Sequence, residues 1–227
     1  MYQAQIKQAA LFAGTEGYPS PVPQTKDGVA VFQTPWSYYA KMGLMFNVHE
    51  NVLSTAINGS VADASSLVLT IPTIRFTVPS GTTVLPRRFD LNMATAAGTV
   101  TEVAIVYTDT DTYTSGGTAL ATIIKNLRTT NGAGGAPPAT KVTNAYQGSG
   151  TALVEAAMTN PRRLGGLTKG FAAAASAGEL FMNSTWEWSD LIPIDGPASF
   201  LIFIGAVTTT PSFEFDLTWA EVPTASV

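Results

Sequence analysis

Apolar and polar residues alternate strictly near the end of the sequence, and this pattern constrains the fold more than any other feature. The apolar members of the alternation are Phe213, Phe215, Leu217 and Trp219. Successive side chains of a strand point to opposite faces, so a period of two predicts a strand with one buried face. The same alternation at residues 74–78 and 89–93 predicts two more strands of this kind.

Two further runs, residues 103–107 and 200–204, are apolar at nearly every position. Such runs are typical of central strands that are covered on both faces. We expect residues 198–207 and 213–222 to form a hairpin with its turn at 208–212. Turns rich in glycine and proline separate the strands, and no long amphipathic helix alternates with them. The sequence therefore predicts an all-β fold, an antiparallel and jelly-roll-like β-sandwich.

The N-terminal region, residues 1–65, shows little periodicity, and we interpret it as an extended arm followed by the first strands. Proline fixes its own φ and pushes the preceding residue towards an extended conformation, so residues 18–24 are expected to be extended. Residues 3–12 can form a short helix. Residues 66–227 are expected to form the sandwich, interrupted by a loop or short helix at 165–178.

The composition excludes several classes of protein. Charged residues make up 12% of the 227-residue chain, about half of the 25% that is typical of globular proteins. Without cysteine there is no disulfide scaffold and no thiolate metal site, and His49 is the only histidine. The net charge of −4 argues against binding to nucleic acid. The longest apolar run, residues 200–207, is far shorter than the roughly 20 residues of a membrane span. We expect no membrane partner and no cofactor.

The low charge also bears on the surface of the protein. Soluble monomers usually keep about 25–35% of their surface residues charged. A surface poor in charge suits a subunit whose neighbours cover much of it. The alternative is a monomer that hydroxyl groups keep soluble.

No motif in the chain forms a convincing active site. His49 is followed directly by Glu50, and neighbours in a strand point to opposite faces, which argues against a catalytic pair. Asp109 and Asp111 have the spacing of a calcium loop, but that loop also needs a glycine at its sixth position and a glutamate at its twelfth. Thr114 and Leu120 occupy those positions. A solvated acidic turn is the preferred interpretation, and we expect no enzymatic activity.

Two groups of residues could bind partners. Trp186 and Trp188 flank Glu187, but in a strand the acid lies on the opposite face from the tryptophans, so core or subunit-interface tryptophans are favoured over a sugar site. The pairs at 87–88 and 162–163 are both arginines, and we interpret them as ion-pair partners.

Several phrases resemble small structural proteins of tailed bacteriophages. They are residues 74–83, 102–107, 114–118 and 126–128, and the ending at 196–204 with Trp219-Ala220-Glu221. The resemblance covers roughly residues 66–222 and is to virion decoration (cement) proteins. It implies a jelly-roll-like subunit, usually trimeric, and it carries no catalytic residues.

The resemblance implies a function as a capsid decoration subunit on the virion surface, made in the host cytoplasm. Its expected partners are the major capsid protein lattice and its own copies as a homotrimer. The aromatic residues expected at the capsid or subunit interface are Tyr18, Trp36, Tyr38, Tyr39, Phe171, Trp186 and Trp188. The alternatives are a carbohydrate- or receptor-binding module of a tail or fibre, and a major coat protein. A coat protein that packages a genome should carry a basic arm, which residues 1–30 lack.

Overall fold

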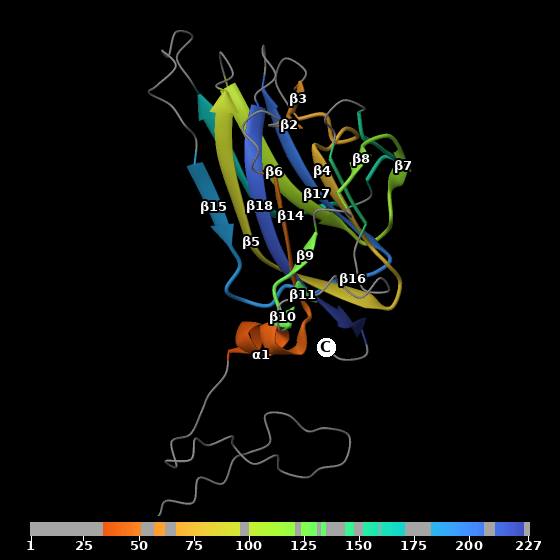
Figure 1. The fold of residues 1–227 in the computed structure, drawn as a ribbon. Coiled ribbons are helices and arrows are strands. Elements are labelled where there is room, and N and C mark those ends of the chain that lie inside the picture. Colours follow the sequence, from red (N-terminus) through yellow and green to blue (C-terminus); the bar gives the residue numbers. More distant parts are fainter. Residues whose placement is uncertain are drawn as a thin grey trace, which may run out of the picture. The chain divides into compact units, whose positions relative to one another are not determined.

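The structure is a computed structural model, and its arrangement is drawn in Figure 1. It describes residues 34–50, 57–61, 67–95, 100–120, 124–130, 133–134, 144–147, 152–158, 160–170, 183–206 and 212–224. The chain divides into two units, Met1–Tyr38 and Tyr39–Val227. All the strands that the structure describes lie in the second unit. The one helix among the described residues, α1 (Pro35–Met42), crosses the boundary.

Two large antiparallel sheets form the second unit. The first, which we call the β5 sheet, contains in spatial order β15 (Asn183–Glu187), β5 (Thr82–Thr95), β18 (Ser212–Pro223), β1 (Met45–Glu50) and β9 (Lys125–Asn126). Two short strands join it, β16 (Ile194–Asp195) on β5 and β2 (Ile57–Asn58) on β18. The long strands β5 and β18 run side by side over most of their length (Figure 1).

The second sheet, the β17 sheet, contains in spatial order β14 (Arg162–Gly170), β6 (Val100–Thr108), β17 (Ala198–Ala206), β4 (Ile74–Val78), β12 (Asn144–Gln147) and β8 (Thr118–Ala119). The short strand β3 (Ser60–Val61) pairs with β17 in the parallel sense. Two separate pairs complete the list: β10 (Thr129–Thr130) with β11 (Ala133–Gly134), and β7 (Tyr113–Ser115) with β13 (Val154–Glu155).

The main core lies between the two sheets. Along β18 the burial alternates as the sequence predicts, with Phe213, Phe215, Leu217 and Trp219 buried. These side chains pack in one cluster with those of the β17 sheet, such as Phe76, Phe200 and Ile202. The Phe76 ring meets Trp219 edge-on, with ring centroids 5.2 Å apart. Two sheets that enclose one core make this an all-β, antiparallel β-sandwich, as predicted.

A second, smaller cluster explains why β6 and β17 are apolar on both faces. Ile105 and Ile202 point into the main core, whereas Val106, Leu201 and Phe203 point to the outer face of the β17 sheet. There they pack with Ala104, Leu67 and Met158. Because these side chains are covered on the outer face too, the predicted central strands are confirmed.

The predicted hairpin of residues 198–207 and 213–222 is wrong. β17 pairs with β6, β4 and β3, while β18 pairs with β5, β1 and β2. The two consecutive strands therefore lie in opposite sheets and face each other across the core. An alternating apolar face is buried equally well by a strand beside it or by a sheet opposite it, so the pattern alone does not separate the two arrangements.

The loop or short helix predicted at 165–178 is wrong for its first part, since residues 165–170 belong to β14 and pair with β6. Backbone pairing along β6 holds this stretch in a strand despite its glycines. Residues 171–178 lie outside the described residues. So do the predicted helix at 3–12 and the predicted extended segment at 18–24.

The helix α1 was not among the expected elements, yet its start has ordinary helix-capping chemistry. Pro35 occupies the first helical position, which needs no amide hydrogen. The Oγ1 of Thr34 accepts a hydrogen bond from the amide of Ser37 at 3.2 Å, as an N-cap residue does.

Candidate functional site

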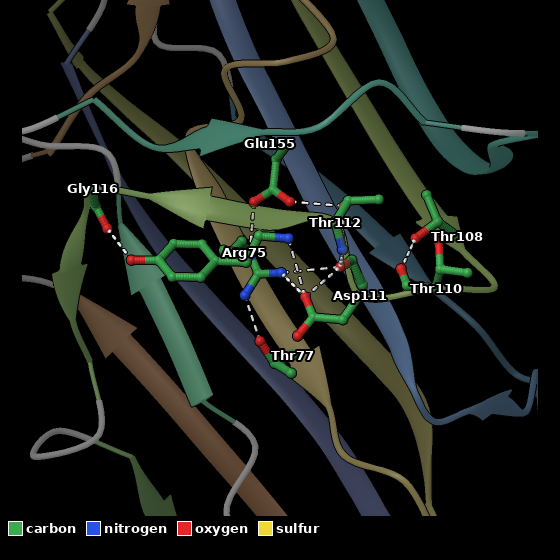
Figure 2. A network of polar contacts seen from close by, with 10 residues as sticks. Arg75, Thr77, Thr108, Thr110, Asp111, Thr112, Gly116 and Glu155 are labelled. Carbon is green, nitrogen blue, oxygen red and sulfur yellow. Dashed lines mark hydrogen bonds and ion pairs between the residues drawn. The ribbon is translucent and has the colours of Figure 1, made fainter.

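The largest polar cluster among the described residues is centred on Arg75, a fully buried arginine in β4 (Figure 2). Its neighbours Ile74 and Phe76 belong to the main core. Arg75 therefore reaches the outer face of the β17 sheet, where the pair of strands β7 and β13 lies close to it (Figure 2). An arginine stays charged at any pH of interest, so its burial requires several partners.

Two carboxylates supply the countercharge. The Nε of Arg75 donates to Oε1 of Glu155 at 2.6 Å, and its Nη2 donates to Oδ1 of Asp111 at 2.5 Å. The Glu155 side chain has no exposed surface, whereas that of Asp111 is 39% exposed. The predicted acidic turn is exposed at both Asp109 and Asp111, and Asp111 in addition pairs with the buried arginine.

Hydroxyl groups complete the cluster. Arg75 also donates to the hydroxyls of Thr77 and, at 3.0 Å, of Ser199. The hydroxyl of Thr112 donates to Oε2 of Glu155 at 2.7 Å, so both carboxylate oxygens have donors. The ring of Tyr113 lies 4.6 Å from the Arg75 guanidinium carbon, at a cation–π distance.

The cluster fastens two loops to the outer face of the sheet. Asp111 and Thr112 lie between β6 and β7, and Glu155 lies in β13. Backbone hydrogen bonds extend the attachment, from the Glu155 amide to the Thr70 carbonyl and from the Ala156 amide to the Thr112 carbonyl. Burial raises the pKa of Glu155, although its bonds to Thr112 and Arg75 act in the opposite direction.

The cluster lacks the parts of a nucleophilic active site. Ser199 Oγ donates to Oδ1 of Asp111 at 3.3 Å, but no histidine accompanies them. The one histidine of the chain, His49, is an exposed residue of β1 in the other sheet, opposite Asp216 of β18. Among the described residues no group of three His, Asp or Glu side chains could hold a metal ion. What the Arg75 cluster can do is hold chain segments in place.

The arginine pairs behave largely as expected. Arg87 pairs with Glu187, Arg88 with Asp90 and Arg162 with Asp109. The prediction of ion-pair partners is confirmed for these three. Arg163 has no ion pair among the described residues, and its Nε donates to the Gly165 carbonyl at 3.1 Å.

The two predicted tryptophans lie at one edge of the sandwich. Trp186 is half-buried and stacks on Phe89, with ring centroids 5.5 Å apart. Trp188 is only 8% exposed, belongs to the main core and donates its indole N–H to the Leu164 carbonyl at 3.3 Å. Glu187 is exposed on the opposite side, as the strand pattern predicts.

Three of the other predicted interface residues lie on the helix α1, away from the tryptophans of β15 in the sequence. Trp36, Tyr38 and Tyr39 lie on α1, where Tyr38 is 51% exposed and the other two are half-buried. Tyr18 and Phe171 lie outside the described residues.

A groove that the sequence reasoning missed lies on the outer face of the β17 sheet. It has a volume of about 320 Å³, and we call it the β6 groove. Its lining residues are Leu67, Leu69, Glu102, Ala104, Val106, Pro161 and Arg163. Leu69 is 46% exposed. The groove is the uncovered continuation of the second cluster, since Leu67, Ala104 and Val106 belong to both.

One residue in the run at 102–107 indicates this groove in the sequence. Glu102 interrupts the outer face of a strand that is otherwise apolar on both faces. A carboxylate there indicates that the outer face is not covered along its whole length. Where the cover ends depends on Leu67, Leu69 and Pro161, which come from segments remote in sequence.

Comparison with known proteins adds no relative, since no family model, curated protein sequence or solved structure matches the chain. None of the helices in the described part of the chain is long and apolar enough to cross a membrane.

Proposed function

We propose that the chain is a non-enzymatic structural subunit of a tailed-bacteriophage virion, bound to the outside of the capsid. The partners in this proposal are the lattice of the major capsid protein and further copies of the chain, associated as a trimer. The phage phrases described above suggest this class of protein, and the sandwich fold is compatible with it. A decoration subunit stabilises a shell because it binds the assembled lattice and not the free coat subunits.

The observation that carries the proposal is the low charge of the chain together with apolar side chains that the sandwich leaves exposed. The chain has 12 Lys and Arg and 16 Asp and Glu. The ion pairs of the described residues engage nine of these side chains, among them the buried pair of Arg75 and Glu155. At the same time Leu69, Tyr113 and Val154 are exposed. A chain with few charged residues and exposed apolar side chains suits contact with neighbouring subunits.

The test is to locate the chain on particles. Antibodies raised against the purified protein are applied to phage particles released from cells that make it, and gold labelling is viewed by electron microscopy. Label over the capsid shell supports the proposal. Label confined to tails or fibres, or particles without label, overturns it.

A carbohydrate- or receptor-binding module is the rival function. Sugar recognition by tryptophan requires an exposed indole face. Trp188 does not supply one because it is buried, and Trp186 has one face stacked on Phe89. Labelling of tails together with glycan-array binding that Trp186→Ala abolishes would support this function instead.

A further inference from the structure

The β6 groove has a regular arrangement of side chains along its floor. Glu102, Ala104 and Val106 follow one another at alternate positions on the outer face of β6, and Arg163 of β14 lies opposite Val106 in the register. At 3.3–3.4 Å per residue, Glu102 and Val106 are roughly 13 Å apart along the strand. The backbones of Glu102 and Arg163 therefore lie at opposite ends of an apolar floor.

Within the part of the chain that the structure describes, neither Glu102 nor Arg163 has an ion-pair partner. The neighbouring Arg162, by contrast, pairs with Asp109. Among the described residues that line the groove, Glu102 and Arg163 are the two that carry a charge.

The side chain of Arg163 is already held over the groove. Its Nε donates to the Gly165 carbonyl at 3.1 Å. It also passes so close to Gly166 that a Cβ there would lie 2.0 Å from Nη2. Because Gly166 pairs with Ala104, the guanidinium extends from its end of the groove towards the middle. An arginine held in this way loses less conformational entropy when it binds a carboxylate.

We propose that the β6 groove is a contact surface between two copies of this chain, related by a two-fold axis that passes between Glu102 and the guanidinium of Arg163. In this contact Glu102 of each copy pairs with Arg163 of the other. The apolar floor and the exposed Leu69 are removed from water between the two charge pairs.

The charge pattern favours a second copy over another partner. A basic partner would neutralise only Glu102, and an acidic partner only Arg163. A two-fold axis brings the same patch of both copies together, so a carboxylate and a guanidinium on either side of the axis pair twice. The groove is thus complementary to itself.

This contact goes beyond the proposed function and does not depend on it. A two-fold contact doubles the number of chains in an assembly, so monomers become dimers and trimers become hexamers. Its signature is a factor of two in molecular mass, whether or not the chain attaches to a capsid.

The test is charge reversal in the full chain, with mass measured by light scattering and sedimentation equilibrium. We expect Glu102→Arg and Arg163→Glu each to halve the mass relative to the wild type. The double variant carries both reversals, so each pair is restored with exchanged signs, and its mass should return to the wild-type value. Circular dichroism and thermal unfolding establish that each variant is folded.

A matched control separates the groove from the general effect of charge. Arg162→Glu makes the same change one residue away, outside the groove lining, and should leave the mass unchanged. Leu69→Ser should lower the mass, whereas Leu191→Ser, at another exposed leucine, should not. The proposal is overturned if neither single reversal lowers the mass below that of the wild type. It is also overturned if the double variant stays at half mass.

Discussion

The guanidinium of Arg75 and the carboxylate of Glu155 form an ion pair in which neither side chain has any exposed surface, with an Nε–Oε1 distance of 2.6 Å. The pair joins β4 to β13, which are 80 residues apart in sequence. It is the central contact between the β17 sheet and the loops that lie on its outer face.

Removing one member of this pair should be costly. Glu155→Ala removes the fully buried countercharge of Arg75 and keeps the partly exposed Asp111. Such changes cost about 3–5 kcal/mol of unfolding free energy. Urea denaturation followed by circular dichroism measures the loss. The matched control is Asp109→Ala, which breaks an ion pair whose two side chains are largely exposed and should leave stability close to that of the wild type. Equal losses in the two variants would contradict the structural role of the buried pair.

The pH dependence of stability should report on Asp216. Burial raises the pKa of this carboxyl; a hydrogen bond from Asn47 and the charge of His49 oppose the shift, while Asp90, directly opposite in β5, adds to it. A raised pKa in the folded state means that the folded protein binds the proton more tightly than the unfolded chain. The contribution of Asp216 to stability is therefore complete below its ordinary pKa of 3.8 and is lost as the pH rises through the raised value.

Asp216→Asn removes this titration and keeps an oxygen that accepts the bond from Asn47. We expect the variant to be more stable than the wild type at pH 7 and to show a smaller loss of stability between about pH 4 and 7. Urea unfolding at a series of pH values measures both effects. Asp190→Asn, at an exposed position, serves as the control. Parallel pH profiles for the wild type and Asp216→Asn would refute the prediction.

Gly165 of β14 lies close to the indole of Trp186. A Cβ at this position would lie 2.8 Å from Cδ1 of Trp186. Gly165→Ala should therefore destabilise the protein by about 1–3 kcal/mol, as overpacking usually does. Chemical unfolding measures the loss, and near-ultraviolet circular dichroism reports the displaced indole.

A second substitution tests the cause of that loss. With Trp186→Leu already in place, Gly165→Ala should cost clearly less, because the atom it would meet is gone. If the cost of Gly165→Ala is the same with and without Trp186, the close approach to Trp186 is not its origin.

Deleting residues 1–25 should leave a folded sandwich, because all described strands begin at or after residue 45. Under the proposed function the truncated chain should attach less strongly to capsid shells, since the proline-containing segment is expected to reach a neighbour. Circular dichroism checks folding, and co-sedimentation with shells that lack the protein measures attachment. Unchanged occupancy would show that the arm takes no part.

The sequence predicts the fold class because the spacing of apolar residues along a strand shows which of its faces are buried. The alternation from Phe213 to Trp219 reappears as alternate burial in β18, and the two-sided runs became β6 and β17. Which strands pair is a different matter. β17 and β18 follow each other in sequence and lie in opposite sheets, and no local pattern distinguishes that arrangement from a hairpin.

The polar clusters were less accessible to prediction than the core. Arg75 sits at an outward position of β4, where a charged side chain is normally solvated. Only the fold shows that Asp111 and Glu155 cover it. Long-range ion pairs of this kind leave no periodicity, and their members come from loops whose placement depends on the whole sheet.

The edge of the sandwich at β14 has one more consequence. The register of this strand against β6 shifts between Arg163 and Gly165, and the carbonyl of the residue in between, Leu164, is occupied by the indole of Trp188. A bulged edge with arginines at its start is a poor template for backbone pairing with another molecule. Fibril growth by backbone pairing at this edge is therefore disfavoured, and contacts with other molecules here depend on side chains.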